Sequence, residues 1–146
     1  MEKKREILEE QIKQALTSTF KVISNQVEDK NSKNNDFKIK TLDFSEIKDL
    51  KSKNDYIRLR ANTDSKALKI RFSDHGIFIK NQPKNPALSK IYELSEKIRC
   101  EMLGSKMLMG IKKNLENNYY QKINSKKYKD VNAKKDINVL DAFELY

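Results

Sequence analysis

The sequence predicts a mainly α-helical domain of about four helices, with a short extended or β segment near residues 37–44. Apolar residues recur every three or four positions over long stretches, which is the period of an amphipathic helix. Only three glycines and two prolines interrupt the 146 residues. Hydrophobic residues make up 37% of the chain, enough for one modest core. We therefore expect residues 1–146 to form a single domain.

The N-terminal part predicts one long helix, a loop and a short extended segment. Apolar positions from Ile7 to Val27 keep helical spacing, so we expect a helix over about residues 2–27. The polar run at 28–36 is typical of a loop. Residues 37–41 alternate apolar and polar side chains, which predicts a strand or an extended loop.

Residues 54–80 allow two interpretations. Leu68, Ile70 and Phe72 alternate with charged residues ahead of Gly76, which is compatible with a β-hairpin over 66–80. The alternative is one helix over about residues 54–80, in which Gly76 costs about 1 kcal/mol.

The C-terminal part predicts two further helices. Pro86 suits the first turn of a helix that runs to about residue 115. A polar, lysine-rich stretch follows at 117–135, and a last amphipathic helix begins near residue 136. Because that pattern is still apolar at Tyr146, we expect the chain to be a fragment of a longer protein.

The formal net charge is +10, with 26 lysines and only five arginines. The bases are spread along the whole chain and form no dense stripe with interleaved aromatic residues, so we favour a solvated lysine surface over a nucleic-acid footprint. No apolar run approaches the roughly 20 residues of a membrane span, and the first residues lack the apolar core of a secretory signal. We expect a cytoplasmic protein that does not bind membranes.

Few residues could carry chemistry. The single His75 excludes a histidine metal cluster, and the single Cys100 excludes an internal disulfide and a multi-cysteine zinc site. The sequence has no phosphate-binding glycine loop and no dinucleotide fingerprint. We expect no catalytic residue, bound cofactor or metal in this chain, and we expect Cys100 to be a small buried side chain.

Charged residues on helix faces that otherwise look internal are the candidate site: Arg60, Asp64, Arg71, Asp74, Glu96, Arg99 and Glu101. Several of them have the i, i+3 or i, i+4 spacing of ion pairs within a helix. They predict either ion pairs that fix the helix register or a polar groove for an anionic ligand or partner. In the first case Arg71→Ala and Arg99→Ala should each cost ~3 kcal/mol or more. If the residues instead form a groove for a partner, both substitutions should leave the free energy of unfolding unchanged and abolish complex formation.

The same residues carry a resemblance to a known family. Three motifs match it in order and spacing: Arg60-x-x-x-Asp64-x-x-Ala67-Leu68-x-x-Arg71-x-x-Asp74, Glu96-x-x-Arg99-x-Glu101-x-Leu103-Gly104 and Gly110-x-x-x-Asn114-Leu115. This pattern resembles the N-terminal region of the aerobic cobaltochelatase T subunit, or CobT, family. The resemblance runs over about residues 20–145, is strongest over 60–115, and favours the helix over the hairpin at 54–80.

The resemblance implies a place in an ATP-dependent enzyme. Such subunits are similar to the D subunit of magnesium chelatase and join an AAA+ ATPase subunit and a large porphyrinoid-binding subunit. The complex uses ATP and Mg²⁺ to insert cobalt into hydrogenobyrinic acid a,c-diamide. Family members continue with an acidic linker and a C-terminal von Willebrand A-type domain, neither of which is in this chain. The expected function is therefore a non-catalytic N-terminal assembly domain.

Two other hypotheses rest on charge. The basic domain could bind its own acidic linker, in which case the association should weaken with salt. Alternatively the chain is a basic nucleic-acid-binding module, supported by the net charge and by the tyrosines and lysines at 119–129, or it is an orphan interaction module. Nucleic-acid binding requires a steep loss of affinity with salt, and loss of binding when Lys126, Lys127 and Lys129 are neutralised.

Overall fold

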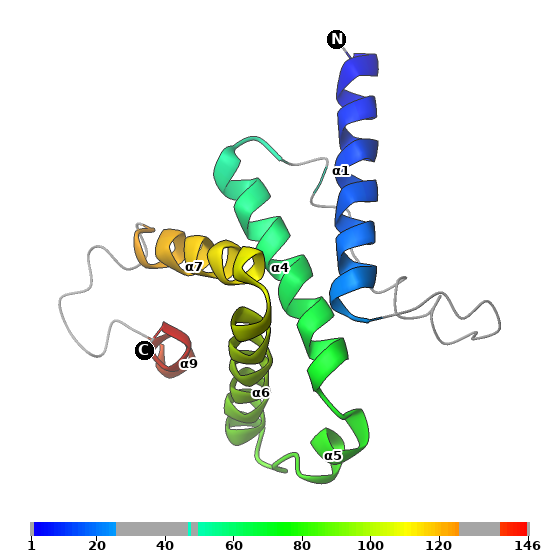
Figure 1. The fold of residues 1–146 in the computed structure, drawn as a ribbon. Coiled ribbons are helices and arrows are strands. Elements are labelled where there is room, and N and C mark those ends of the chain that lie inside the picture. Colours follow the sequence, from blue (N-terminus) through cyan, green and yellow to red (C-terminus); the bar gives the residue numbers. More distant parts are fainter. Residues whose placement is uncertain (1, 26–46, 48–49, 126–137, 146) are drawn as a thin grey trace. The chain divides into compact units, whose positions relative to one another are not determined.

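The computed structural model describes residues 2–25, 47, 50–125 and 138–145 (Figure 1). Within these ranges the structure has six helices and no strand: α1 (Glu2–Ile23), α4 (Lys53–Phe72), α5 (His75–Lys80), α6 (Pro86–Met107), α7 (Met109–Ile123) and α9 (Val139–Leu145). The mainly helical prediction is confirmed. The extended segment predicted near residues 37–44 lies outside the described residues. The chain divides into two compact units, Met1–Arg71 and Phe72–Tyr146, which we describe in turn.

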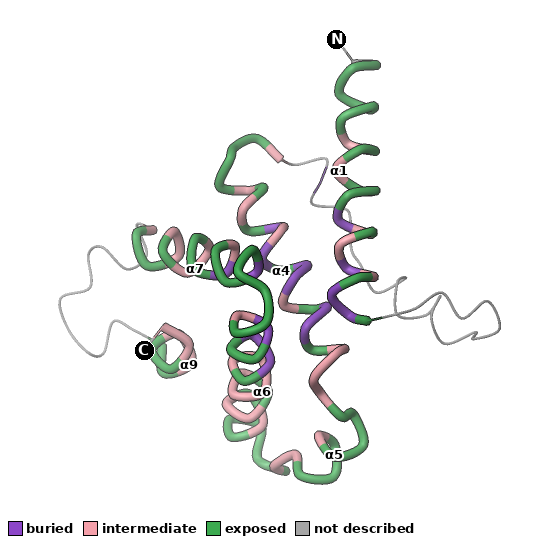
Figure 2. The backbone as a smooth tube through the Cα atoms, viewed as in Figure 1, coloured by how far each residue is buried: buried purple, intermediate pink, exposed green. Residues whose placement is uncertain are grey.

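In the first unit, α1 buries only its C-terminal half, where Leu16, Phe20 and Ile23 are almost fully covered (Figure 2). The helix was expected to reach residue 27 but ends at Ile23. Asn25 takes the left-handed conformation at φ 56°, and its N–H donates to the carbonyl of Val22 at 3.2 Å. Asparagine tolerates this conformation, which terminates the helix.

The second helix of this unit, α4, starts at a capping box. The Asp55 carboxylate accepts hydrogen bonds from the Ser52 hydroxyl at 2.8 Å and the Ser52 N–H at 3.0 Å, and the Asp55 N–H donates back to the Ser52 hydroxyl. The hydrogen bond from the Ser52 hydroxyl is the main cause that lowers the pKa of Asp55. Beyond this cap, Leu59 packs in a cluster with Leu16 and Ile47. The core of this unit therefore joins α1 to α4.

The helix predicted over residues 54–80 is wrong in one respect, because it is two helices. α4 ends at Phe72, and Asp74 adopts an extended conformation before α5 begins at His75. The Asp74 carboxylate accepts a hydrogen bond from the Ile77 N–H at 2.9 Å, so it acts as an N-cap that starts a new helix. The hairpin alternative is also wrong, since residues 66–72 and 75–80 are helical.

In the second unit, α6 begins where the sequence predicts. Asn85 caps it by accepting hydrogen bonds from the N–H groups of Ala87 and Leu88, and Pro86 is its first residue. The helix expected to reach residue 115 is interrupted at Leu108, which is extended at φ −133° and ψ 109°. The chain then continues as α7 through the first part of the polar stretch predicted from residue 117.

The core of the second unit lies along α6, which packs against α7 and α9. Cys100, Glu101 and Gly104 are buried on one side of α6, and Ile111 and Leu115 are buried on α7. The prediction that Cys100 is a small buried side chain is thus confirmed. On another part of α6 the Tyr92 ring stacks on Phe78 of α5, with centroids 4.8 Å apart.

Candidate functional site

The first motif pair, Arg60 and Asp64, lies one turn apart on α4. The Arg60 Nε is 3.2 Å from both carboxylate oxygens of Asp64, whose side chain is fully buried. The Arg60 Nη1 also donates to the Thr19 hydroxyl of α1 at 3.2 Å. A buried carboxylate requires a compensating positive charge, and this guanidinium supplies it while joining two helices.

Arg71 acts at the end of α1. Its Nη1 donates to the carbonyl of Ile23, the last residue of that helix, at 3.1 Å. The last carbonyls of a helix have no partner within the helix and carry partial negative charge, so a guanidinium there is favourable. The spacing that predicted an Arg71–Asp74 pair does not apply, because α4 ends between the two residues and Asp74 caps α5.

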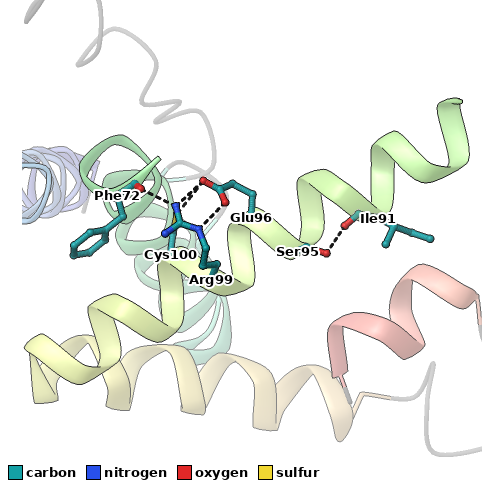
Figure 3. Close-up of polar contacts among 6 residues, drawn as sticks. All are labelled: Phe72, Ile91, Ser95, Glu96, Arg99 and Cys100. Carbon is teal, nitrogen blue, oxygen red and sulfur yellow. Dashed lines mark hydrogen bonds and ion pairs between the residues drawn. The ribbon is translucent and has the colours of Figure 1, made fainter. Parts of the chain in front are cut away.

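Glu96 and Arg99 form a two-pronged ion pair on α6 (Figure 3). The Arg99 Nε and Nη2 each lie 2.7 Å from one oxygen of Glu96. The Nη2 also donates to the carbonyl of Phe72 at 2.7 Å. This hydrogen bond joins Phe72, the first residue of the second unit, to α6. The hydrogen bond to Glu96 raises the pKa of Arg99.

Two neighbours of this pair complete the view in Figure 3. The buried Cys100 thiol lies 3.8 Å from Arg99 Nη2 and 3.9 Å from Glu96 Oε1, at the edge of the ion pair. One turn earlier, the Ser95 hydroxyl donates to the Ile91 carbonyl at 2.8 Å. Both contacts lie within α6.

Glu101 belongs to a separate set of charges that we call the three-helix charge cluster, formed by Lys97, Glu101, Tyr119, Lys122 and Glu144. The nearly buried Glu101 accepts a hydrogen bond from the Tyr119 hydroxyl of α7 at 2.7 Å. Lys97, one turn earlier on α6, has its Nζ 3.9 Å from Glu101 and 5.7 Å from the centre of the Tyr119 ring.

The third helix enters the cluster through Glu144 of α9. Its carboxylate accepts hydrogen bonds from Lys97 of α6 at 2.5 Å and from Lys122 of α7. Burial opposes ionisation of Glu144, but the two lysines outweigh it and lower the pKa of this carboxyl. Burial, followed by the negative charge of Glu101, raises the pKa of Tyr119, so its hydroxyl remains a donor.

The structure therefore uses the seven predicted residues in separate places. Arg60 and Asp64 pair, Glu96 and Arg99 pair, and Arg71 and Asp74 serve helix ends. Glu101 joins the three-helix charge cluster, whose other four members were not among the predicted site residues. The spacings of Lys97 to Glu101 and of Tyr119 to Lys122 place each pair on one helix face, so the sequence could have predicted that the members of each pair lie close together. The contacts of Glu144 with Lys97 and Lys122 depend on helix packing, and no spacing in the sequence predicts them.

Two further properties concern the described part of the chain. There, no group of three or more His, Cys, Asp or Glu side chains is arranged to hold a metal ion. None of the helices described combines the length and the apolar character that crossing a bilayer requires.

Comparison with known proteins gives one result that covers nearly the whole chain. Searches of curated proteins and of solved structures returned no significant match. A family model described as cobalamin biosynthesis protein CobT matches residues 7–146. This match contains all three motifs on which the resemblance rested. The chain therefore belongs to the CobT family and has a role in cobalamin biosynthesis.

Proposed function

We propose that this chain is a non-catalytic assembly domain of an ATP-dependent cobaltochelatase, the enzyme that inserts cobalt into hydrogenobyrinic acid a,c-diamide in the cytoplasm. Family membership supports the biosynthetic context. The motif resemblance supports the position of the domain near the N-terminus of the T subunit.

One observation carries the proposal of an assembly role. All seven charged candidate side chains contact groups of the same chain, as ion pairs, at helix ends or as acceptors of a hydrogen bond from a neighbouring helix. Charges used in this way hold the helices within each unit together, which suits units that present a defined surface to a partner. A catalytic acid or base would instead need to face a cleft.

The proposed partners are the AAA+ ATPase subunit and the large porphyrinoid-binding subunit. In this proposal ATP and Mg²⁺ belong to the ATPase subunit, and cobalt is the substrate of the complex. The chain's own acidic linker is a third proposed partner, because a chain of net charge +10 attracts an acidic segment. A nucleic-acid role has less support, since Tyr119, which would stack on bases, donates its hydroxyl to Glu101 within the fold.

The experiment is a binding and activity test with purified subunits. The chain is mixed with each of the two partner subunits and analysed by size-exclusion chromatography with light scattering. It is also incubated alone with ATP, Mg²⁺, Co²⁺ and hydrogenobyrinic acid a,c-diamide, and cobalt insertion is followed by absorbance. We expect co-elution with at least one subunit and no insertion by the chain alone. Cobalt insertion without partners, or elution apart from both subunits, would contradict the proposal.

The linker proposal is tested separately with a peptide of the linker sequence. Fluorescence anisotropy at low and high salt should show binding that weakens as salt rises, because the attraction is between exposed charges. Affinity that is unchanged between the two conditions would overturn this third partner and leave the other two untouched.

A further inference from the structure

The junction of α6 and α7 gathers exposed apolar side chains that we call the junction patch: Met102, Leu103, Met107, Leu108 and Met109. The three methionines are 58%, 51% and 77% exposed. Figure 2 colours the backbone of this junction as exposed. A run of five large apolar side chains left in water within eight residues is costly, and such patches mark interaction surfaces.

The distribution of methionine makes the junction patch unusual within this chain. The sequence has four methionines, and all three that follow Met1 lie in the patch. Methionine is flexible and polarizable, so it adapts to the shape of an apolar partner, and binding surfaces that accept amphipathic helices use it for this reason. Core positions of the same unit use other residues, such as Cys100 and Leu115.

The geometry of the patch fits a helix. Leu103 and Met107 are one turn apart on α6 and form an apolar row, and the neighbouring row runs from Met102 to Lys106. Met102, Leu103 and Met107 are at least one-third exposed, whereas Glu101 and Gly104 between them are buried, so the last turns of α6 leave these three apolar side chains outside the core of the unit. A partner helix lying along this surface would place apolar residues against Leu103 and Met107 and an acidic residue beside Lys106.

The rim of the patch indicates the charge of the partner. Lys106, Lys112 and Lys113 border it and are exposed, and Glu116 lies 3.8 Å from Lys112. Three lysines and one glutamate leave a local charge of +2. A second copy of this chain would bring the same lysines face to face, and each copy carries a net charge of +10. Charge complementarity therefore favours an acidic partner over self-association.

We infer that the junction patch is a docking surface for an amphipathic helix of another protein, with acidic residues on both sides of its apolar face. Apolar side chains of that helix fill the space between the methionines, and its carboxylates meet the lysine rim. The assignment of this helix to a chelatase subunit rests on the proposed function, whereas the chemistry of the surface does not.

The surface is tested first without any natural partner. The probe is a synthetic helix of about 18 residues with leucines at helical spacing and glutamates beside them. A peptide of the same composition in scrambled order is the control. Methionine methyl groups of the chain are labelled with carbon-13 and observed by NMR. We expect the three patch methionines to shift with the helical probe only. Absence of shifts, or equal shifts with the scrambled peptide, would overturn the inference.

Variants then separate apolar contacts from charge. Met102→Ser combined with Met107→Ser and Met109→Ser should weaken probe binding by at least about tenfold, since truncation of central apolar anchors has the largest effect. Conversion of the same three methionines to leucine should preserve most of the affinity and excludes a folding defect. Ile7→Ser with Leu8→Ser, at similarly exposed positions of α1, should leave binding unchanged. Equal losses in the two serine variants would overturn the inference.

The same variants are finally tested against the chelatase subunits. If the wild-type chain binds neither subunit, the proposed function fails, and the peptide result alone decides the inference. If the wild-type chain and the triple serine variant bind a subunit equally well, the assembly role stands and the junction patch is overturned as its surface. A dimer in sedimentation that the triple serine variant abolishes would assign the patch to a second copy, which also overturns the inference.

Discussion

The Tyr119 hydroxyl of α7 lies 2.7 Å from a carboxylate oxygen of Glu101, a nearly buried residue of α6. This contact supplies a donor to an acid that water hardly reaches. A buried charge without its donor loses more than the value of one hydrogen bond, because the carboxylate has already lost its hydration. Removal of this contact should therefore report how much it contributes to the packing of α7 on α6.

Tyr119→Phe should lower the free energy of unfolding by about 1–3 kcal/mol, because it removes a donor to a buried carboxylate and leaves the ring in place. Urea unfolding of the full chain, followed by circular dichroism, measures the change. The adjacent Tyr120 is 70% exposed, and Tyr120→Phe is the matched control with little expected effect. Equal stabilities of the two variants would show that the Glu101 contact contributes nothing.

Glu144→Gln should destabilise the chain at neutral pH by about 1–2 kcal/mol, because Lys97 and Lys122 lose the charge between them. The folded-state pKa of Glu144 is lowered from its ordinary 4.5, so the stabilisation is present above that value. It is lost as the pH falls through the lower folded-state pKa.

The difference in stability between wild type and Glu144→Gln should therefore shrink as the pH falls below 4.5 and on through the lowered folded-state pKa, where the wild-type carboxyl takes up a proton. Urea titrations at several pH values give this curve. Glu116→Gln, at an exposed position of α7, is the control and should change stability at neutral pH by less than about 0.5 kcal/mol. A difference that stays constant over this pH range would argue against an ionised Glu144 in the folded state.

Arg60→Ala should cost about 3 kcal/mol, since it removes the guanidinium that contacts the fully buried Asp64 and its link to Thr19. The control is Arg58→Ala on the same helix, where the arginine is 58% exposed and lies 3.7 Å from Asp55. That change should stay within about 0.5 kcal/mol. Thermal or urea unfolding distinguishes the two, and comparable losses would contradict a special role for the buried pair.

Arg99→Ala should cost about 1 kcal/mol, less than the ~3 kcal/mol that the sequence led us to expect. The Arg99 side chain is 48% exposed, so water replaces much of what the guanidinium gives to Glu96. Arg99→Lys should recover only part of the loss, because an ammonium cannot match the two-pronged contact. Unchanged stability together with loss of subunit binding would instead place Arg99 on a partner surface.

The sequence predicted helices well where periodicity ran without interruption, as in α1 and the start of α6. It failed where a side chain interrupts the pattern. Asp74 is compatible with the interior of a helix by spacing, but its carboxylate caps α5 and ends the expected single helix. Leu108 is neither a glycine nor a proline, so the sequence gives no reason to expect its extended conformation between α6 and α7.

For the candidate residues, the sequence predicted contacts within one helix but not contacts between helices. Pairs one turn apart, Arg60 with Asp64 and Glu96 with Arg99, were predictable because a helix places them together. Contacts between helices were not, since the positions of Thr19 beside Arg60 and of Glu144 beside Lys97 depend on packing. For this reason the three-helix charge cluster was identified only from the structure, although Glu101 had already been selected.

The link at Leu108 makes the second unit sensitive to chain length. The Leu108 N–H donates to the Gly104 carbonyl of α6 at 3.0 Å, while its own carbonyl accepts the N–H of Ile111 in α7 at 3.0 Å. Leu108 therefore takes part in the hydrogen bonding of both helices, and no further residue separates α6 from α7. A single inserted residue would turn α7 by about 100° about its axis and carry Tyr119 away from Glu101. Many side chains at this link would preserve the contact, but one residue more or fewer would break it.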